Sequence, residues 1–398
     1  MLNDEKIEFF EGTQRVTTPE KTIEKYEPML RTAGITRITE ITHLDRIGIP
    51  VFSAIRPTSQ DGGVSVYAGK GIGVNQAKAS AIMEGFERYS AERQGNEEIV
   101  VANMNDLEGN YIDPKTLNLP QETKNYSNFE IEWSTAFDLV TEKEFYVPSN
   151  AIYHPYIPEN NCLALFKGHT NGLASGNVVE EAILHSIFEV IERDAWSIYE
   201  LTRKNSRQIN LETVKSDLIN DLLEKFSKND IEIRLFDLTA DIKVPTILAS
   251  ADDTLLKDAG LLSIGIGTHL DPEIAVLRAL TEVAQSRATQ IQGAREDTVR
   301  ADIVRKVGYE KTKKKYKHYF NDKESKIDFS EIPNKSTGSL KDDIDIVIKE
   351  LKANGIENVL YKDITRPEIG VNVVRVVIPT MEMYSVDKGR VGDRCLKI

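Results

Sequence analysis

The sequence predicts an α/β fold of mixed α+β character, in which a single domain covers residues 1–398. Three observations support this prediction. Hydrophobic residues make up 40% of the chain and charged residues 28%, which is an ordinary balance for a globular protein. Segments with helical spacing of apolar residues alternate along the chain with short runs typical of strands. We also find no clear linker that would cut the chain into independent domains. We therefore expect a large sheet with helices packed against it.

The elements are predicted in chain order from start, stop and periodicity signals. A helix begins at Pro19, capped by Thr18, and ends at Gly34. Residues 35–51, rich in Thr and Ile, are expected to be extended. Residues 300–345 are strongly charged around 311–326, which predicts an exposed insertion. The remaining predictions are strands at 64–68, 231–238, 245–251, 260–267, 359–363 and 371–378, a Gly-rich turn at 69–73, strand and loop at 99–160, a loop at 168–176, and helices at 75–94, 179–201, 212–227, 273–292 and 341–353.

Charge and cysteine content exclude several functional classes. The net charge of −13 disfavours general binding to nucleic acid or anionic membranes, because the average field repels phosphate. Cys162 and Cys395 match neither a zinc-binding spacing nor a disulfide framework. No stretch approaches the roughly 18 apolar residues of a membrane span, and the first residues lack the features of a secretory signal. We expect a cytoplasmic protein.

Three predicted helices share one pattern of residues. Counted from Ala77, Ala182 and Ala275, each carries a polar residue three positions later, a glutamate seven positions later, and Glu or Gln ten positions later. At about 100° per residue these positions fall on one face, beside an apolar face that would enter a core. The pattern predicts one site built from three similar arms. The residues of the three polar stripes are Ser80, Glu84, Glu87 and Arg88; His185, Glu189, Glu192 and Arg193; and Arg278, Glu282, Gln285 and Ser286.

The chemistry of these stripes indicates a metal–nucleotide site. Carboxylates three residues apart on one helix face repel each other, and a cation would compensate that repulsion in a cleft. Oxygen ligands without cysteine suit Mg²⁺ shared with substrate phosphates, and Arg88, Arg193 and Arg278 could hold the phosphates. One such charged face is typical of a solvated helix, but three copies at matching offsets favour a site.

Other motifs contribute less. The run Gly69-Lys70-Gly71 does not fit a Walker motif, and Gly265-Ile266-Gly267 lacks the third glycine of a dinucleotide fingerprint. Each is expected to be either a tight turn with positive φ or an anion-holding turn. No Cys–His or Gly-x-Ser-x-Gly arrangement supports a covalent nucleophile.

At these motifs the chain resembles the YcaO superfamily, over roughly residues 15–394. The stretch 34–51 and the segment RVVIP at 375–379 resemble the TfuA-associated, thioamide-forming branch known as methanogenesis marker protein 1, and residues 391–398 do not match the Pro-rich tail common in azoline-forming members. The matching stretches are GITR at 34–37, LDRIGIPV at 44–51, RP at 56–57, GKG at 69–71, SAIMEGFER at 80–88, TNGLASG at 170–176, EVIERD at 189–194, EVAQSR at 282–287 and RVVIP at 375–379.

The resemblance implies a fold whose strand–loop–helix units converge on ATP and Mg²⁺. It makes Glu84, Glu87, Glu189 and Glu192 the expected Mg²⁺ ligands, with residues 1–56 contributing to the nucleotide site. The residues expected to contact the nucleotide are Arg15, Thr22, Ser80, Arg88, His185, Arg193, Arg278, Glu282, Gln285 and Arg287.

The resemblance also implies an ATP-dependent enzyme that activates peptide amides. For this branch we expect thioamidation with sulfide as nucleophile, making thioglycine in the α subunit of methyl-coenzyme M reductase, with a TfuA protein as partner and a homodimer as the assembly. The alternative is an azoline-forming cyclodehydratase that acts on Cys, Ser or Thr of a peptide. A non-catalytic nucleotide sensor would not need so many carboxylates, and a kinase would need HRD- and DFG-like motifs that the sequence lacks.

Overall fold

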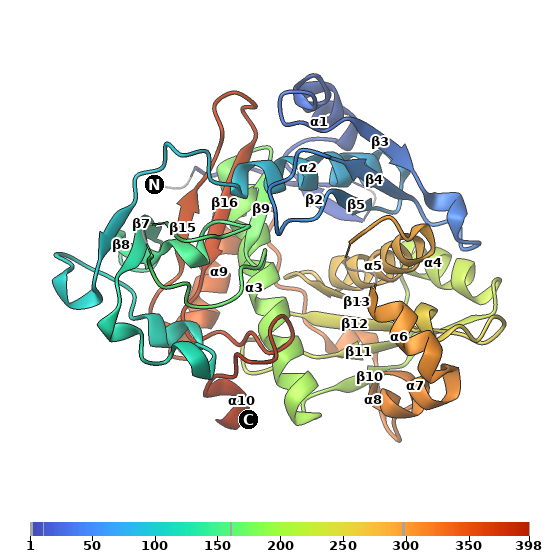
Figure 1. The fold of residues 1–398 in the computed structure, drawn as a ribbon. Helices are drawn as coiled ribbons and strands as arrows, with labels where there is room; N and C mark the ends of the chain where they lie inside the picture. Colours follow the sequence, from blue (N-terminus) through green and yellow to red (C-terminus); the bar gives the residue numbers. More distant parts are fainter. Residues whose placement is uncertain (1–2, 11, 160, 297–298, 398) are drawn as a thin grey trace.

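The computed structural model describes residues 3–10, 12–159, 161–296 and 299–397. Its strands are divided among separate sheets rather than joined in the large sheet that we expected (Figure 1). The strands divide in this way because each pairs mainly with antiparallel neighbours in its own sheet. Each of the larger sheets then packs one face against a long helix. The mixed α/β class is confirmed. No helix in the described ranges is long and apolar enough to span a membrane.

The first sheet carries α2 (Val74–Ala91), which buries Ile82 and Phe86 against it. Helix α1 (Pro19–Tyr26) packs on α2 and begins as predicted, with the Thr18 side chain accepting a hydrogen bond from Lys21 N. Its predicted end at Gly34 is wrong, because Pro28 cannot continue the helix and residues 27–29 form a 3₁₀ turn. The strands of this sheet lie in the order β3 (Arg37–Glu40), β4 (Val51–Ile55) and β5 (Val66–Lys70).

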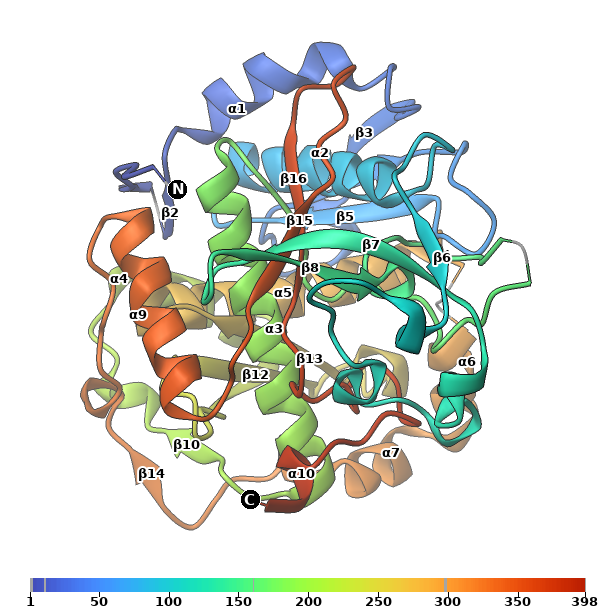
Figure 2. The ribbon, with the colours of Figure 1, turned by 90° about the vertical axis from the view of Figure 1, so that its left-hand side faces the viewer.

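The second sheet packs against α3 (Val179–Thr202), and α9 (Leu340–Ala353) lies beside that helix (Figure 2). Ile187 of α3, Val347 of α9 and Val376 of the sheet are buried in one cluster. The strands lie in the order β6 (Val100–Ala102), β7 (Ile131–Asp138), β15 (Leu360–Asp363), β16 (Asn372–Val377) and β9 (Leu173–Gly176), and β8 (Lys143–Pro148) pairs with β7.

The third sheet packs against α5 (Pro272–Gln292), which starts at the Asp271 cap and ends at Gly293 in the left-handed conformation. Helix α4 (Asp217–Ser227) contacts α5 and β11. The strands lie in the order β13 (Ser263–Thr268), β12 (Thr246–Asp253), β11 (Ile231–Asp237), β10 (Arg207–Ile209) and β14 (Lys326–Ile327). The other elements are the hairpin β1 (Glu8–Phe10) and β2 (Thr13–Arg15), and the helices α6 (Val299–Val307), α7 (Tyr309–Lys315), α8 (Lys317–Phe320) and α10 (Arg394–Lys397).

The charged segment 300–345 combines an exposed face with buried anchors. Most of its lysines and acids are exposed or half-buried, in line with the composition. Tyr319 and Phe320 are buried, however, in a cluster with Tyr199 of α3 and Phe236 of β11. The segment is therefore packed into the fold rather than simply displayed on its surface.

Glycines bring each long helix close to the strand before it. A Cβ on Gly69 would lie 2.0 Å from Ala81 N, one on Gly176 would lie 2.6 Å from Ala182 N, and one on Gly267 would lie 2.2 Å from Ala275 O. Gly69 and Gly267 lie inside strands without positive φ, so our expectation of turns at these glycines is wrong. Their role is close helix–strand packing, which a side chain would block.

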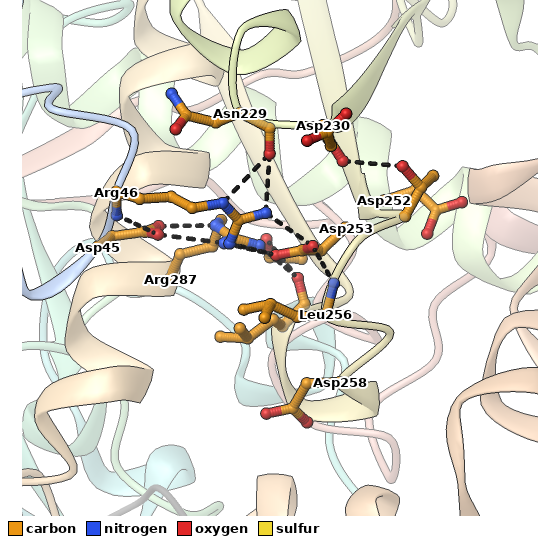
Figure 3. Close-up of polar contacts among 12 residues, drawn as sticks. Asp45, Arg46, Asn229, Asp230, Asp252, Asp253, Leu256, Asp258 and Arg287 are labelled. Carbon is orange, nitrogen blue, oxygen red and sulfur yellow. Dashed lines mark hydrogen bonds and ion pairs between the residues drawn. The ribbon is translucent and has the colours of Figure 1, made fainter.

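A buried ion-pair network joins the N-terminal region to the third sheet (Figure 3). Arg287 of α5 is fully buried and donates to Asp45 Oδ2 (2.7 Å) and to Asp253 Oδ2 of β12 (3.0 Å). Arg46 donates to the same Asp253 carboxylate at 2.9 and 2.8 Å. Burial alone would raise the pKa of Asp253, but hydrogen bonds from Arg46, Leu256 and Arg287 outweigh burial and lower it. Our assignment of Arg287 as a nucleotide contact is therefore wrong: its guanidinium is occupied by buried aspartates.

Replacing Arg287 is expected to affect stability rather than nucleotide binding. Arg287→Ala leaves the buried Asp45 without its partner and should lower the free energy of unfolding by about 3–5 kcal/mol. Denaturant unfolding measures this change. Arg305→Ala is the matched control, because Arg305 pairs with Asp258 at the surface and should change stability by less than about 1 kcal/mol. Unchanged stability with lost nucleotide affinity would contradict the structural role.

Candidate functional site

The three long helices α2, α3 and α5 line one cavity of about 700 Å³, a volume within the usual range for small-molecule sites. The structure brings together there every side chain that we predicted for the nucleotide and the metal, apart from Arg287. The predicted residues that line the cavity are Arg15, Thr22, Ser80, Glu84, Glu87, Arg88, His185, Glu189, Glu192, Arg193, Arg278, Glu282 and Gln285.

The polar stripes lie on helices that are otherwise buried. On α3 most residues from 180 to 199 are buried, whereas His185, Glu189 and Arg193 are half-buried because they face the cavity. The same holds on α5 for Arg278, Glu282 and Gln285. These charged faces are therefore not ordinary solvated helix surfaces.

On α2 the two carboxylates are held by different neighbours. Glu84 accepts a hydrogen bond from Arg88 Nη2 (2.9 Å) and one from the backbone N–H of Ala68 (3.3 Å). Glu87 Oε1 accepts from the backbone N–H and the hydroxyl of Ser175, at 2.9 and 2.8 Å. Burial and the nearby charge of Glu84 raise the pKa of Glu87 to about 8. The Glu87 carboxyl thus has a strong tendency to gain a proton or a cation.

On α3 the carboxylates are less well paired. Within the described ranges no group donates a hydrogen bond to Glu189 or Glu192, and the nearest cation to Glu192 is Arg193 Nη2 at 3.8 Å. Burial raises the pKa of Glu192 to about 7 and also raises that of Glu189. Carboxylate oxygens that face a cavity and accept no hydrogen bond are suited to a cation.

The α5 arm supplies cations and an amide. Arg278 Nη1 donates to Nδ1 of His185 (3.1 Å), and burial and the Arg278 charge keep the pKa of His185 well below its ordinary value. Burial alone would raise the pKa of Glu282, but its ion pair with Lys70 outweighs burial and lowers it. Gln285 donates to the carbonyl of Ala68. This arm therefore crosses to the end of β5 and closes one side of the cavity.

The N-terminal segment reaches the cavity through two side chains. Arg15 of β2 lies 3.6 Å from Glu181 of α3, and the Thr22 hydroxyl donates to Asn177 Oδ1 at 3.2 Å. Both residues belong to the lining of the cavity.

Sequence reasoning missed Lys70, Ser175 and Glu181 as residues of this site. We judged Lys70 against a Walker motif, which it fails, and otherwise quoted it only for resemblance. It ends β5, and its ammonium pairs with Glu282 from a helix more than two hundred residues away. The signal that could have placed Lys70 in the site was its position between two glycines, directly before the first of the three helices. Ser175 lay in a motif that we quoted only for resemblance.

The side chains that line the large cavity are chemically suited to bind Mg²⁺ and a nucleotide. The unpaired oxygens of Glu189 and Glu192 offer hard anionic ligands, and Arg88, Arg193 and Arg278 border the same cavity. No group of three or more metal-binding side chains is preassembled in the part of the chain that the structure describes. Mg²⁺ commonly uses one or two carboxylates and takes its other ligands from water and phosphate.

Comparison with known proteins agrees with this geometry. The family model "YcaO cyclodehydratase, ATP- and Mg2+-binding" matches residues 68–382. An uncharacterised protein of Methanothermobacter thermautotrophicus is 53% identical over 376 residues, which cover 94% of this chain and 97% of that protein. An uncharacterised protein of Rhizobium leguminosarum bv. trifolii, described as lying in the tfuA 3′ region, is 30% identical and covers 93% of this chain and 89% of its own length.

Solved structures match over nearly the whole chain. YcaO from Methanopyrus kandleri, bound with AMPPCP and Mg²⁺, has a TM-score of 0.81 at 28% identity and covers 98% of both chains. A heterocyclase in complex with substrate and cofactor has a TM-score of 0.82 at 25% identity, covering 96% of this chain and 54% of that one. From the family match and the shared fold, the chain belongs to the YcaO family of ATP- and Mg²⁺-binding, cyclodehydratase-type enzymes.

Proposed function

We propose that this chain is an ATP-dependent peptide thioamide synthase that uses sulfide and acts on a glycine in the α subunit of methyl-coenzyme M reductase. The observation that carries the proposal is the cavity of paired glutamates and arginines, which is equipped for phosphates and a cation but has no cysteine in its lining. An external nucleophile is consistent with that composition.

The branch is supported by the relatives. The 53% identical protein comes from a methanogen, and the Rhizobium relative is described by its place beside tfuA. We therefore propose a TfuA protein as partner. From the family resemblance alone, we also propose a homodimer as the assembly. Azoline formation remains the second candidate, because a structure described as a heterocyclase shares the fold at a TM-score of 0.82.

In the proposed reaction hydrosulfide adds to the carbonyl carbon of the peptide, and the resulting oxyanion accepts the terminal phosphoryl group of ATP, releasing ADP. The former carbonyl oxygen then leaves as phosphate while the S–H proton is lost, so that a C=S bond forms. This route makes a poor leaving group into a good one without a covalent enzyme intermediate.

The side chains of the cavity would act by charge and position. Arg88, Arg193 and Arg278 would hold the phosphates and stabilise the charge that develops on them. Glu189 and Glu192, joined by Glu84 and Glu87, would hold Mg²⁺, which neutralises phosphate charge. Lys70 and Glu282 would keep α5 against β5 and maintain the width of the cavity.

Peptide mass analysis tests the proposal. The purified enzyme, with Mg-ATP, sulfide and a peptide from the glycine region of the reductase, should add the mass difference between sulfur and oxygen and release ADP. The Glu84→Ala/Glu189→Ala double variant should lose this product, because the cation site loses a ligand from each of two arms. Glu224→Ala, at an exposed position of α4, is the matched control and should retain activity.

Other results of this assay have distinct meanings. Loss of one water from a peptide containing Cys, Ser or Thr would assign the enzyme to azoline formation. The assay is run with and without a TfuA protein, so that a missing partner is not mistaken for inactivity. ATP binding without any change of peptide mass under both conditions would contradict an amide-modifying role.

Mg-ATP binding is expected to release protons near neutral pH. The pKa of Glu87 is raised to about 8 and that of Glu192 to about 7, so both carboxyls hold protons below these values in the metal-free enzyme. Cation binding needs the ionised form, so affinity should rise with pH and level off above about 8. Calorimetry in buffers of different ionisation enthalpy measures the released protons.

The matched variants for this experiment are Glu87→Gln and Glu224→Gln. The Glu87→Gln variant has no titratable carboxyl at this position, so it should release fewer protons when Mg-ATP binds near neutral pH. Glu224→Gln should behave like the wild type. Binding with no proton exchange at any pH between the two values would refute direct participation of these carboxyls.

A further inference from the structure

A second, small cavity of about 40 Å³ lies behind the loop that precedes β9. Arg375 of β16 and Arg390 of the C-terminal segment line it, together with His169, Asn171 and Phe166. The volume is sufficient for one or two species of the size of water. Nothing in the proposed handling of nucleotide and Mg²⁺ uses this cavity.

Both arginines are buried without a counter-charge. Arg375 is 1% exposed and Arg390 is 3% exposed. In the described part of the chain neither forms an ion pair, and Nη1 of each has no hydrogen-bond partner. Their other contacts are with neutral groups. Arg375 donates to the carbonyls of Ala151 and His169 at 2.8 Å each and lies 3.1 Å from His169 Nδ1. Arg390 donates to Asn118 O at 3.1 Å and to Leu117 O, and its guanidinium lies 3.9 Å from the centre of the Phe166 ring.

Two buried guanidinium groups without an anionic partner are energetically unfavourable as long as the cavity holds no ligand. A buried guanidinium needs an anionic partner to offset its desolvation, and carbonyl groups offset only part of it. Burial lowers the pKa of Arg375 to about 9 and that of Arg390 to about 10. Glu189 attracts the Arg375 charge from the neighbouring site, but Arg88 and Arg390 oppose it.

The small cavity and the large cavity share a wall. In the loop 169–173, Thr170 and Leu173 line the large cavity, whereas His169 and Asn171 line the small one. On α3, Glu189 lines the large cavity and the adjacent Val190 lines the small one. A ligand of the small cavity is therefore held directly beside the proposed reaction site.

We propose that this cavity is a subsite for a small monovalent anion and that it holds hydrosulfide beside the reaction site. The hydrosulfide assignment rests on the proposed function, whereas the anion subsite rests on the two unpaired arginines. Phe166, whose ring stacks on the Arg390 guanidinium, and Met383 make part of the wall apolar, so among the described residues the positive charge of the subsite comes from the two arginines alone.

Bromide is the probe for this subsite, because it is monovalent, polarisable and visible by anomalous scattering. Crystals of the full chain soaked in sodium bromide should show a bromide ion between Arg375 and Arg390. In solution, bromide should raise the melting temperature when it replaces gluconate, an anion too large for the cavity, at constant ionic strength.

Variants separate the anion subsite from general salt effects. Arg390→Met should bind bromide at least about tenfold more weakly, yet melt no lower than the wild type in gluconate, since it removes an uncompensated charge. Asn171→Asp supplies a carboxylate within the cavity, so it should raise the melting temperature and abolish the bromide response even if Arg390→Met fails to fold. Arg305→Met, at the surface, should respond like the wild type.

Competition kinetics test the hydrosulfide role. Bromide should raise the KM for sulfide in thioamide formation and leave kcat unchanged. Bromide bound in the cavity without such competition would overturn the hydrosulfide role, and the absence of both bromide density and a melting shift would overturn the subsite itself. If no thioamide forms at all, the proposed function fails and the hydrosulfide role with it, whereas bound bromide would still support the anion subsite.

Discussion

Repulsion among Glu84, Glu87, Glu189 and Glu192, held in one partly buried cavity, is the constraint to which the rest of the site responds. Burial and the neighbouring carboxylate raise the pKa of Glu87, and burial raises those of Glu189 and Glu192. An isolated helix with such a face would turn it to water. Here the apolar faces of α2 and α3 pack into cores, so the carboxylates are balanced inside the cavity, by hydrogen bonds, protons or cations.

The fold meets this constraint by bringing the arms from separate sheets. Each helix lies so close to its own strand that a side chain at Gly69, Gly176 or Gly267 would collide with helix backbone. This rigid contact fixes where each polar stripe points. Arg88 balances Glu84 from the same helix, whereas Lys70 of β5 pairs with Glu282 of α5 across units. The buried Arg287 network anchors the far end of α5. Charge balance in the site thus depends in part on contacts between units.

Positive charge is distributed differently in the two cavities. In the large cavity, arginines and glutamates border the same space, and the balance can shift when Mg²⁺ and phosphates bind. In the small cavity, Arg375 and Arg390 meet neutral carbonyls and a neutral histidine, whose pKa burial and the Arg375 charge hold well below its ordinary value. The first arrangement suits a cation together with a polyanion, and the second suits a single small anion. Their shared wall makes the two cavities neighbours.

Helical periodicity alone determined the membership of the three arms, because residues three, seven and ten positions after an alanine share a face in any α-helix. The residue types along the chain also predicted the helix cap at Thr18 and a site whose ligands are not cysteines. Only the tertiary structure decided that the strands divide into separate sheets, that the glycines of β5 and β13 serve close packing, and that Lys70, Ser175 and Glu181 belong to the site. It likewise withdrew Arg287, which lies about 200° around α5 from Gln285 and therefore faces Asp45 and Asp253 rather than the cavity. Such pairings join residues far apart in the chain, and no local pattern encodes them.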